Sequence, residues 1–224
     1  MNNNPSKEEI INQAFQFHSQ GNIAEAAKYY QIFLDRGFSD ARINNNLGEI
    51  LRAKGNLKEA ELLTRQAIKM VPNFATAHSN LGLILKGQGN LKEAELSTRK
   101  AIQLNPNFAN ANYNLGNILR DLGKLQEAEI LYRKAIEIKP DYSDAYLNLG
   151  NILKDLGKLQ EAGISYRKAI EIKPDFVMAH YNLGNILRDL GNQQEARLCS
   201  EKIMSIRSWS ILGSFSFNRE MKSD

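Results

Sequence analysis

A period of 34 residues runs through most of this 224-residue chain and limits its fold more than any other feature. Two glycines, an alanine and a proline recur in one register without insertions. They are Gly48, Gly82, Gly116, Gly150 and Gly184; Gly55, Gly89, Gly123, Gly157 and Gly191; Ala60, Ala94, Ala128, Ala162 and Ala196; and Pro72, Pro106, Pro140 and Pro174. Such a period is typical of arrays in which each unit buries its apolar face on its neighbours.

The pattern inside one unit predicts two helices. Residues 109–122 repeat apolar side chains with the spacing of one helix face, at Ala111, Leu115, Ile118 and Leu122. Gly123 then acts as a C-terminal cap, and Pro140 ends the second helix. The apolar positions of that second helix are Leu125, Ala128, Ile130, Ala135, Ile136 and Ile138. Small residues are expected where helix backbones approach closely, at Gly116, Ala128 and Ala135.

The register divides the chain into six units. A degenerate N-terminal unit spans residues 7–40, and Ser6 with Glu9 predicts a capping box at its start. Clearer units span residues 41–74, 75–108, 109–142, 143–176 and 177–210, the last divergent because Ser208 replaces the proline. We expect residues 1–6 to be disordered and residues 211–224 to form a tail. The sequence therefore predicts an all-α chain of about twelve helices.

The C-terminal segment is rich in Ser and Phe and lacks the amphipathic length of a solvating cap helix. Three alternatives stay open for its apolar residues. They fold back on the last hairpin, they contact another chain, as in self-association through the tail, or they are the remains of a longer protein. The residues concerned are Trp209, Ile211, Leu212, Phe215 and Phe217.

The residue pattern of one unit resembles the tetratricopeptide repeat family over about residues 7–210. The positions that carry the resemblance are Leu115, Gly116, Gly123, Ala128, Tyr132, Ala135 and Pro140. The family often has Trp at the fourth position of the unit, where this chain has Asn44, His78, Asn112, Tyr146 and His180. The resemblance implies a right-handed superhelical solenoid of stacked helix-turn-helix units, with the first helices lining a concave groove.

A row of asparagines lies off the apolar stripe of the first helices. One Asn recurs in all six units, at Asn12, Asn46, Asn80, Asn114, Asn148 and Asn182. A second follows three residues later in the last three units, at Asn117, Asn151 and Asn185. Basic residues come one turn on, and those of the last three units, Arg120, Lys154 and Arg188, join the candidate site. An Asn amide carries a donor and an acceptor side by side, so it can pair with a peptide backbone without reading side chains.

This row resembles the repeat region of O-linked N-acetylglucosamine transferases, where a comparable ladder is associated with holding peptide substrates. Three interpretations of the row stay open. The asparagines bind a peptide backbone, other groove residues bind the partner, or the asparagines are structural and bond adjacent first helices. Specificity would come from variable groove positions, namely Glu49, Ser79, Tyr113, Leu147 and Tyr181.

Composition and motifs argue against an enzyme. The net charge of +4 is spread as interspersed Lys/Arg and Asp/Glu, which argues against a nucleic-acid footprint. The one cysteine, Cys199, has no matched histidine, and His78 and His180 fill a packing position three repeats apart. Gly123-Lys124 lacks the spacing and the Ser or Thr of a phosphate loop. We therefore expect no catalytic residues, metal site or cofactor.

The prediction for function is a non-enzymatic scaffold that binds an extended protein or peptide segment. Its site would be the asparagine row and the basic residues beside it. The alternative is a substrate-recruiting arm for a glycosyltransferase or another transferase whose catalytic part lies outside this chain. The N-terminus lacks the plan of a signal peptide and no apolar run is long enough to span a membrane, so we expect a cytoplasmic location and no membrane partner.

Overall fold

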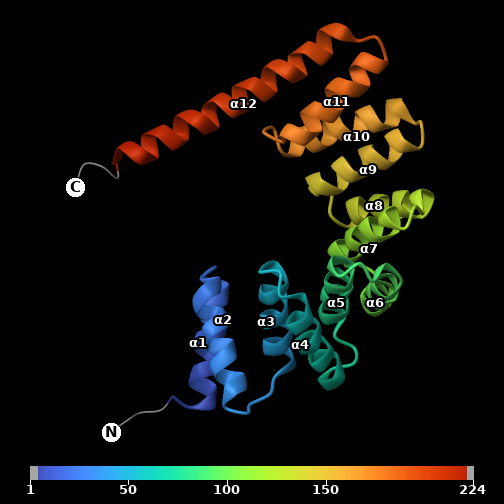
Figure 1. Ribbon diagram of the computed structural model, residues 1–224. Helices are drawn as coiled ribbons and strands as arrows, with labels where there is room; N and C mark the ends of the chain where they lie inside the picture. The colour runs from blue at the N-terminus through green and yellow to red at the C-terminus, as the bar shows by residue number, and fades with distance from the viewer. Residues whose placement is uncertain (1–4, 221–224) are drawn as a thin grey trace. The chain divides into compact units, whose positions relative to one another are not determined.

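The computed structural model describes the backbone of residues 5–220 and the side chains of residues 5–206. Within these residues it has twelve α-helices and no strand, which confirms the all-α repeat fold (Figure 1). The helices are α1 Lys7–Ser19, α2 Ile23–Asp35, α3 Ala41–Ala53, α4 Leu57–Met70, α5 Ala75–Gly87, α6 Leu91–Leu104, α7 Ala109–Asp121, α8 Leu125–Ile138, α9 Ser143–Asp155, α10 Leu159–Ile172, α11 Val177–Asp189 and α12 Gln193–Glu220. The chain forms two compact units, residues 5–122 and 123–220.

Local signals set where the helices begin and end. The predicted capping box is confirmed, because Ser6 Oγ accepts from the Glu9 N–H and the Glu9 carboxylate accepts from the Ser6 N–H. Asp40 caps α3 by accepting from the Arg42 N–H at 2.8 Å. Gly55 and Gly123 follow first helices with φ of 83° and 75°, a left-handed conformation in which a Cβ would be strained.

The first helix of a repeat packs on the second through a glycine and two alanines. A Cβ on Gly82 of α5 would lie 2.0 Å from Thr98 Oγ1 of α6 and 3.2 Å from the Ala94 carbonyl oxygen. A Cβ on Gly150 of α9 would likewise lie 2.5 Å from the ring of Tyr166 of α10. Ala94 and Ala101 on α6 are fully buried beside this contact. The helix propensity that glycine loses is therefore offset by a contact too close for any other residue.

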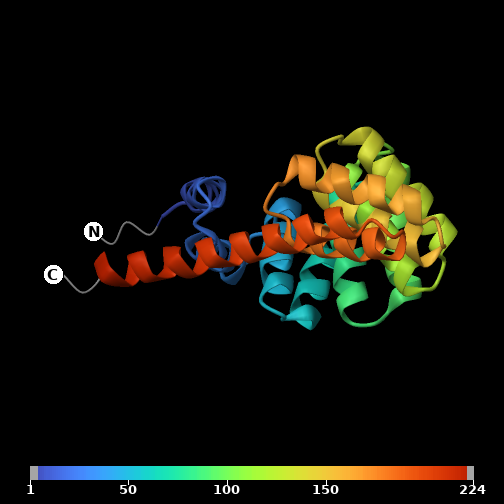
Figure 2. The ribbon, with the colours of Figure 1, turned by 90° about the horizontal axis from the view of Figure 1, so that it is seen from above.

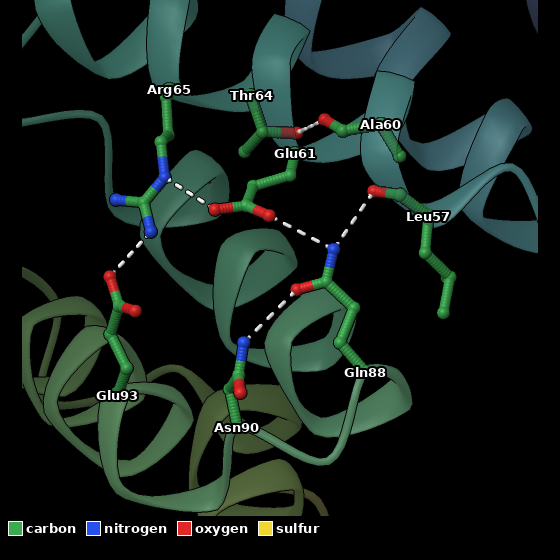
Figure 3. A network of polar contacts seen from close by, with 8 residues as sticks. All are labelled: Leu57, Ala60, Glu61, Thr64, Arg65, Gln88, Asn90 and Glu93. Atoms are coloured by element: carbon green, nitrogen blue, oxygen red, sulfur yellow. Dashed lines mark hydrogen bonds and ion pairs between the residues drawn. The ribbon is translucent and has the colours of Figure 1, made fainter.

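The second helices are linked across repeats by polar side chains. Arg65 of α4 pairs with Glu61 on its own helix and with Glu93 of α6 (Figure 3). Figure 3 also shows Gln88, after α5, donating to the Leu57 carbonyl and the Glu61 carboxylate, at 3.3 and 2.9 Å. In the second unit Arg133 of α8 likewise bridges Glu129 and Glu161, at 2.9 and 2.8 Å. Because these pairs are partly exposed, each contributes little to stability.

One apolar position of the second helix faces solvent. Ile130 belongs to the apolar pattern of α8, yet it is 66% exposed. The equivalent residue of every clear repeat is also exposed, namely Leu62, Leu96, Ile164 and Leu198. A helix in a hairpin array buries the sides that face its partner and its neighbours, and this position faces solvent.

The last helix is twice as long as α8 or α10. α12 has 28 residues against 14 in each of those helices, and it continues without a break across residue 210 (Figures 1 and 2). It packs on α11 through its N-terminal part, where Ala196 and Cys199 are buried. The expectations for Trp209 and the apolar residues after it concern side chains outside the described residues.

The glycine contact gives a direct stability test. Gly82→Ala should destabilise the protein by about 1–3 kcal/mol, because the new methyl group collides with Thr98 and with backbone that cannot move aside. Gly163→Ala is the matched control in α10, where the nearest atom to a Cβ lies 3.8 Å away. That control should stabilise the helix by about 0.5–1 kcal/mol. Urea unfolding followed by circular dichroism measures both, and equal midpoints would contradict the packing account.

Candidate functional site

The asparagine row lies on the first helices of both units. We call the surface formed by α1, α3, α5 and α7 in the first unit, and by α9 and α11 in the second, the first-helix face. The first unit carries Asn12, Asn46, Asn80, Asn114 and Asn117. The second unit carries Asn148, Asn151, Asn182 and Asn185. The predicted row therefore consists of two groups of asparagines, one in each compact unit.

In the first unit the row bonds one first helix to the next. Asn80 of α5 donates through Nδ2 to Asn45 Oδ1 of α3 at 3.0 Å. Asn114 of α7 donates in the same way to Ser79 Oγ of α5 at 3.4 Å. Asn45 in turn donates to Asn46 Oδ1 at 3.3 Å. The amide nitrogens of Asn80 and Asn114 are therefore engaged between repeats, as the structural interpretation of the row expects.

These bonds also change the exposure that the sequence suggested. Asn80 and Asn114 were expected to face an open groove, but each is only 8% exposed because the neighbouring first helix covers its side. Ser79, proposed as a specificity residue, is 2% exposed and cannot read a ligand. Asn46, by contrast, is partly exposed. Helix periodicity alone could not separate a solvent-facing polar side chain from one that is covered by the next repeat.

Where the second helix carries a tyrosine, the bonding takes another form. Tyr166 of α10 is fully buried, and its hydroxyl donates to Asn151 Oδ1 of α9 at 2.9 Å. Asn182 of α11 donates to the same oxygen at 2.8 Å. Burial raises the pKa of the Tyr166 phenol, and the charge of Asp155 raises it further, so the phenol stays protonated as a donor. One asparagine oxygen thus joins three helices.

The first repeat uses its tyrosine in a related way. Asn46 of α3 donates to the hydroxyl of the fully buried Tyr30 at 3.2 Å. His18 Nδ1 lies 2.9 Å from the same hydroxyl. Burial raises the pKa of Tyr30, against the opposite effect of the Asn46 hydrogen bond. His18 is therefore part of a structural network and has a polar partner that the sequence did not reveal.

One position of the second helix decides whether its side chain takes part in the bonds of the asparagine row. Thr64 and Thr98 stand where Tyr30 and Tyr166 stand in their own repeats, and their hydroxyls donate to carbonyls of their own helices at 2.8 Å. A threonine is too short to reach the first-helix face, so no hydroxyl of the second helix joins the inter-repeat bonds that Asn45 and Ser79 accept. Sequence reasoning included bonds between adjacent first helices but missed the part of the tyrosines, whose partners lie 15 or 16 residues away on another helix.

The basic residues that follow the asparagines differ between the two units in their ion pairs and in their exposure. Lys86 of α5 pairs with Asp121 of α7 at 2.7 Å, and Arg120 contacts the same carboxylate at 3.0 Å. Burial would raise the pKa of Asp121, but its hydrogen bonds with Lys86 and Arg120 outweigh burial and lower it. In the second unit Lys154 and Arg188 are exposed.

The two histidines at the fourth repeat position and the one cysteine are packed within the repeats. Nε2 of His78 and of His180 lies 2.9 Å from the carbonyl oxygen of Pro72 and of Pro174, in the loop before its helix. Cys199 is buried, which raises the pKa of its thiol. Among the residues whose side chains are described, no three His, Cys, Asp or Glu residues lie together as metal ligands would. In the same part of the chain no helix is both long and apolar enough to cross a bilayer.

Hollows also occur on the second-helix side of the second unit. One of about 640 Å³ lies between α8 and α10, over Tyr146 and Leu149 of α9. Another of about 250 Å³ lies one repeat further on, beside Cys199. Ser165 and Cys199 are smaller than the Leu131 of the preceding repeat, which leaves this space. Cations at the larger hollow are already paired with carboxylates, as Arg133 is with Glu161.

The three-helix junction in the second unit predicts which asparagine is structural. Asn151→Ala should destabilise the protein by about 1–3 kcal/mol, because it leaves the buried Tyr166 hydroxyl without its acceptor. Asn185→Ala, at the same position of the next repeat, should stay within about 0.5 kcal/mol. Urea unfolding of the two variants makes the comparison. Adding Tyr166→Phe should recover part of the Asn151→Ala loss, and no recovery would argue against the junction.

Comparisons with known proteins agree with this architecture. Among solved structures, the chain is similar to MamA (27% identity, TM-score 0.68, covering 74% of this chain and 96% of that one). It is similar to YrrB, whose structure is described as a TPR protein with an unusual peptide-binding site (23% identity, TM-score 0.64, covering 86% and 100%). PilF of Pseudomonas aeruginosa is also similar (21% identity, TM-score 0.70, covering 74% and 75%). At below 25% identity, the last two show the fold alone.

Family models identify the repeat directly. Tetratricopeptide repeat models match residues 19–73, 75–108 and 98–130, and a TPR repeat model matches residues 116–157 and 150–191. A further tetratricopeptide repeat model matches residues 179–208. No curated protein matches the chain. The matched segments run from residue 19 to residue 208, and the chain belongs to the tetratricopeptide repeat family.

Proposed function

We propose that this chain is a non-catalytic interaction module whose first-helix face binds an extended peptide segment of a protein partner. The observation that carries the proposal is the regular row of Asn side chains, in which Asn46, Asn80, Asn114 and Asn182 each donate a hydrogen bond to a neighbouring helix. Asn80 and Asn114 use their Nδ2 atoms for these bonds. Their Oδ1 atoms would then accept N–H groups of the peptide backbone.

The spacing of the helices suits an extended ligand. Neighbouring helices pack about 8–10 Å apart, and an extended chain rises about 3.3 Å per residue. One acceptor per repeat would therefore meet about every third residue of the peptide. Asn46, Asn80 and Asn114 form such a series in the first unit, and Asn148 and Asn182 form one in the second.

The limited exposure of these side chains restricts the contacts that the asparagine row can make with a ligand. A side chain that is 8% exposed offers a ligand one edge, and a fixed carbonyl oxygen has little ordering entropy left to lose. Each bond contributes about 0.5–1.5 kcal/mol. Affinity would therefore accumulate over several repeats, and the ladder would read the peptide backbone and leave side-chain specificity to other residues.

The decisive experiment separates binding from stability. The double variant Asn80→Ala/Asn114→Ala removes the proposed acceptors and also two inter-repeat bonds. Asn45→Ala/Ser79→Ala breaks the same two bonds from the other side, yet both of its targets are 2% exposed and cannot reach a ligand. Binding of a neutral Ser/Ala-rich peptide of about ten residues, followed by amide chemical shifts, should weaken about tenfold in the first variant only.

Two results would count against the proposal. Equal loss in both double variants would mean that the asparagines act only by holding the repeats together. Unchanged binding in both, with each protein still folded by circular dichroism, would mean that other residues hold the peptide.

A further inference from the structure

An arginine at one position of the second helix joins two carboxylates in more than one repeat. Arg65 of α4 pairs with Glu61, four residues before it, and with Glu93 of α6 (Figure 3). Arg133 of α8 repeats the arrangement, with one acid on α8 and one on α10. In both repeats the arginine Nε donates to the acid of its own helix, at 2.8 and 3.0 Å. The repeat thus places two carboxylates around each of these guanidinium groups.

Arg167 of α10 has lost one of these two carboxylates. Gly163 stands where Glu129 stands in the preceding repeat. The two terminal nitrogens of Arg167 donate to the carboxylate of Glu195 on α12, and the bond from Nη2 is 2.9 Å long. No other described side chain accepts a hydrogen bond from this guanidinium. Its Nε therefore lacks the acceptor that the equivalent arginines have.

A lysine on α12 has also lost the acid of its repeat position. Lys134 and Lys168 each pair with a glutamate three residues further on, at 2.9 and 2.6 Å. Lys202 holds the same position in α12, where Ser205 replaces that glutamate. The Lys202 side chain is exposed and forms no ion pair within the described residues. Its ammonium group is therefore available to an anion.

Both of these cations line the hollow of about 250 Å³ between α10 and α12. The apolar side chains around the same hollow are Ile170, Leu183 and Leu198. Gly163 adjoins it, because a Cβ on this glycine would lie 4.0 Å from Leu183. A cavity of about 150 Å³ is large enough for benzene. The hollow therefore has room for one small ring or short aliphatic chain beside the cations.

The larger hollow between α8 and α10 does not offer the same chemistry. Arg167 borders both hollows, but the other cations of the larger one are paired. Arg133 already bonds two carboxylates, and Lys168 is paired with a glutamate on its own helix. Around the smaller hollow Glu195 is the one acid, against two cations. The charges of the smaller hollow thus favour an anionic ligand.

We infer that the smaller hollow binds a small monocarboxylate with an apolar body, a short aliphatic or aromatic acid. The ligand carboxylate takes the position that Gly163 leaves empty at Arg167, where a guanidinium and a carboxylate form charge-assisted hydrogen bonds. The apolar body fills the space beside Cys199 and is removed from water there. A Glu side chain of a partner protein would leave that space unfilled, so the site favours a free acid. The inference is independent of the proposed peptide-binding function.

Binding of small acids to the full chain tests the inference. The probes are benzoate, its neutral counterpart benzamide, and acetate, which has the carboxylate without the apolar body. Amide chemical shifts followed during titration report each affinity. Benzoate should bind about three to ten times more tightly than benzamide and than acetate. Equal binding of benzoate and benzamide, or of benzoate and acetate, would overturn the inference.

Gly163→Glu restores the acid of the other repeats and gives the sharpest test. The variant should fold, since a Cβ has room there and glycine is a poor helix former. Its new carboxylate should occupy Arg167 Nε and weaken benzoate binding about tenfold. Gln194→Glu adds the same charge at an exposed residue of α12 outside the hollow, and it should change the affinity less than about twofold. Unaltered benzoate binding in Gly163→Glu would contradict the proposed position of the carboxylate.

A second pair of variants assigns the preference for the acid to Arg167. Arg167→Gln should bind benzoate no more tightly than benzamide. Arg197→Gln removes a cation from an exposed position of α12 that does not line the hollow, and it should keep the preference. Circular dichroism checks that both variants are folded. A preference for benzoate that persists in folded Arg167→Gln would refute the assignment.

Discussion

The close approach of each first helix to its second helix is the constraint on which the rest of the structure depends. Gly82 and Gly150 sit where a Cβ would overlap the side chain at one fixed position of the second helix. That position holds Thr98 in one repeat and Tyr166 in the other. Because the two helices lie so close, the hydroxyl of a tyrosine on the second helix reaches the asparagines on the first helix. The helix packing thus decides which polar groups the face presents.

The first-helix face is organised by hydrogen bonds between repeats. Asn80 and Asn114 bond to the preceding first helix, and Asn151 collects bonds from Tyr166 and Asn182. These bonds orient the amides, since a side chain that donates through Nδ2 has a fixed Oδ1. The structural and ligand-binding interpretations of the row are therefore compatible. The Nδ2 atom of the amide bonds to a neighbouring helix, and the Oδ1 atom is the proposed acceptor for a ligand. The opposite face is fixed in a different way, by ion pairs such as Arg133 with Glu161.

Departures from the repeat mark the positions where function can differ between repeats. In α5, Gly87 stands where Asp121 stands in α7, the next first helix, and Arg52 Nε has no hydrogen-bond partner among the described residues. Ser165 and Cys199 are smaller than Leu131 and leave hollows between second helices. In each case a substitution at a repeated position changes one local contact.

The sequence by itself determined the helices, their order and the hairpin contacts. Glycines, prolines and the 34-residue period are local signals, and local signals fix helix ends and the packing of adjacent helices. Only the tertiary structure decided which residues of the candidate site are exposed. Asn80 and Ser79 are covered by helices about 35 residues away in the chain, and Ile130, apolar in pattern, faces solvent. Burial depends on which neighbouring helix covers a side chain. Helical periodicity shows on which face of its helix a side chain lies, but it does not show whether another helix covers that face.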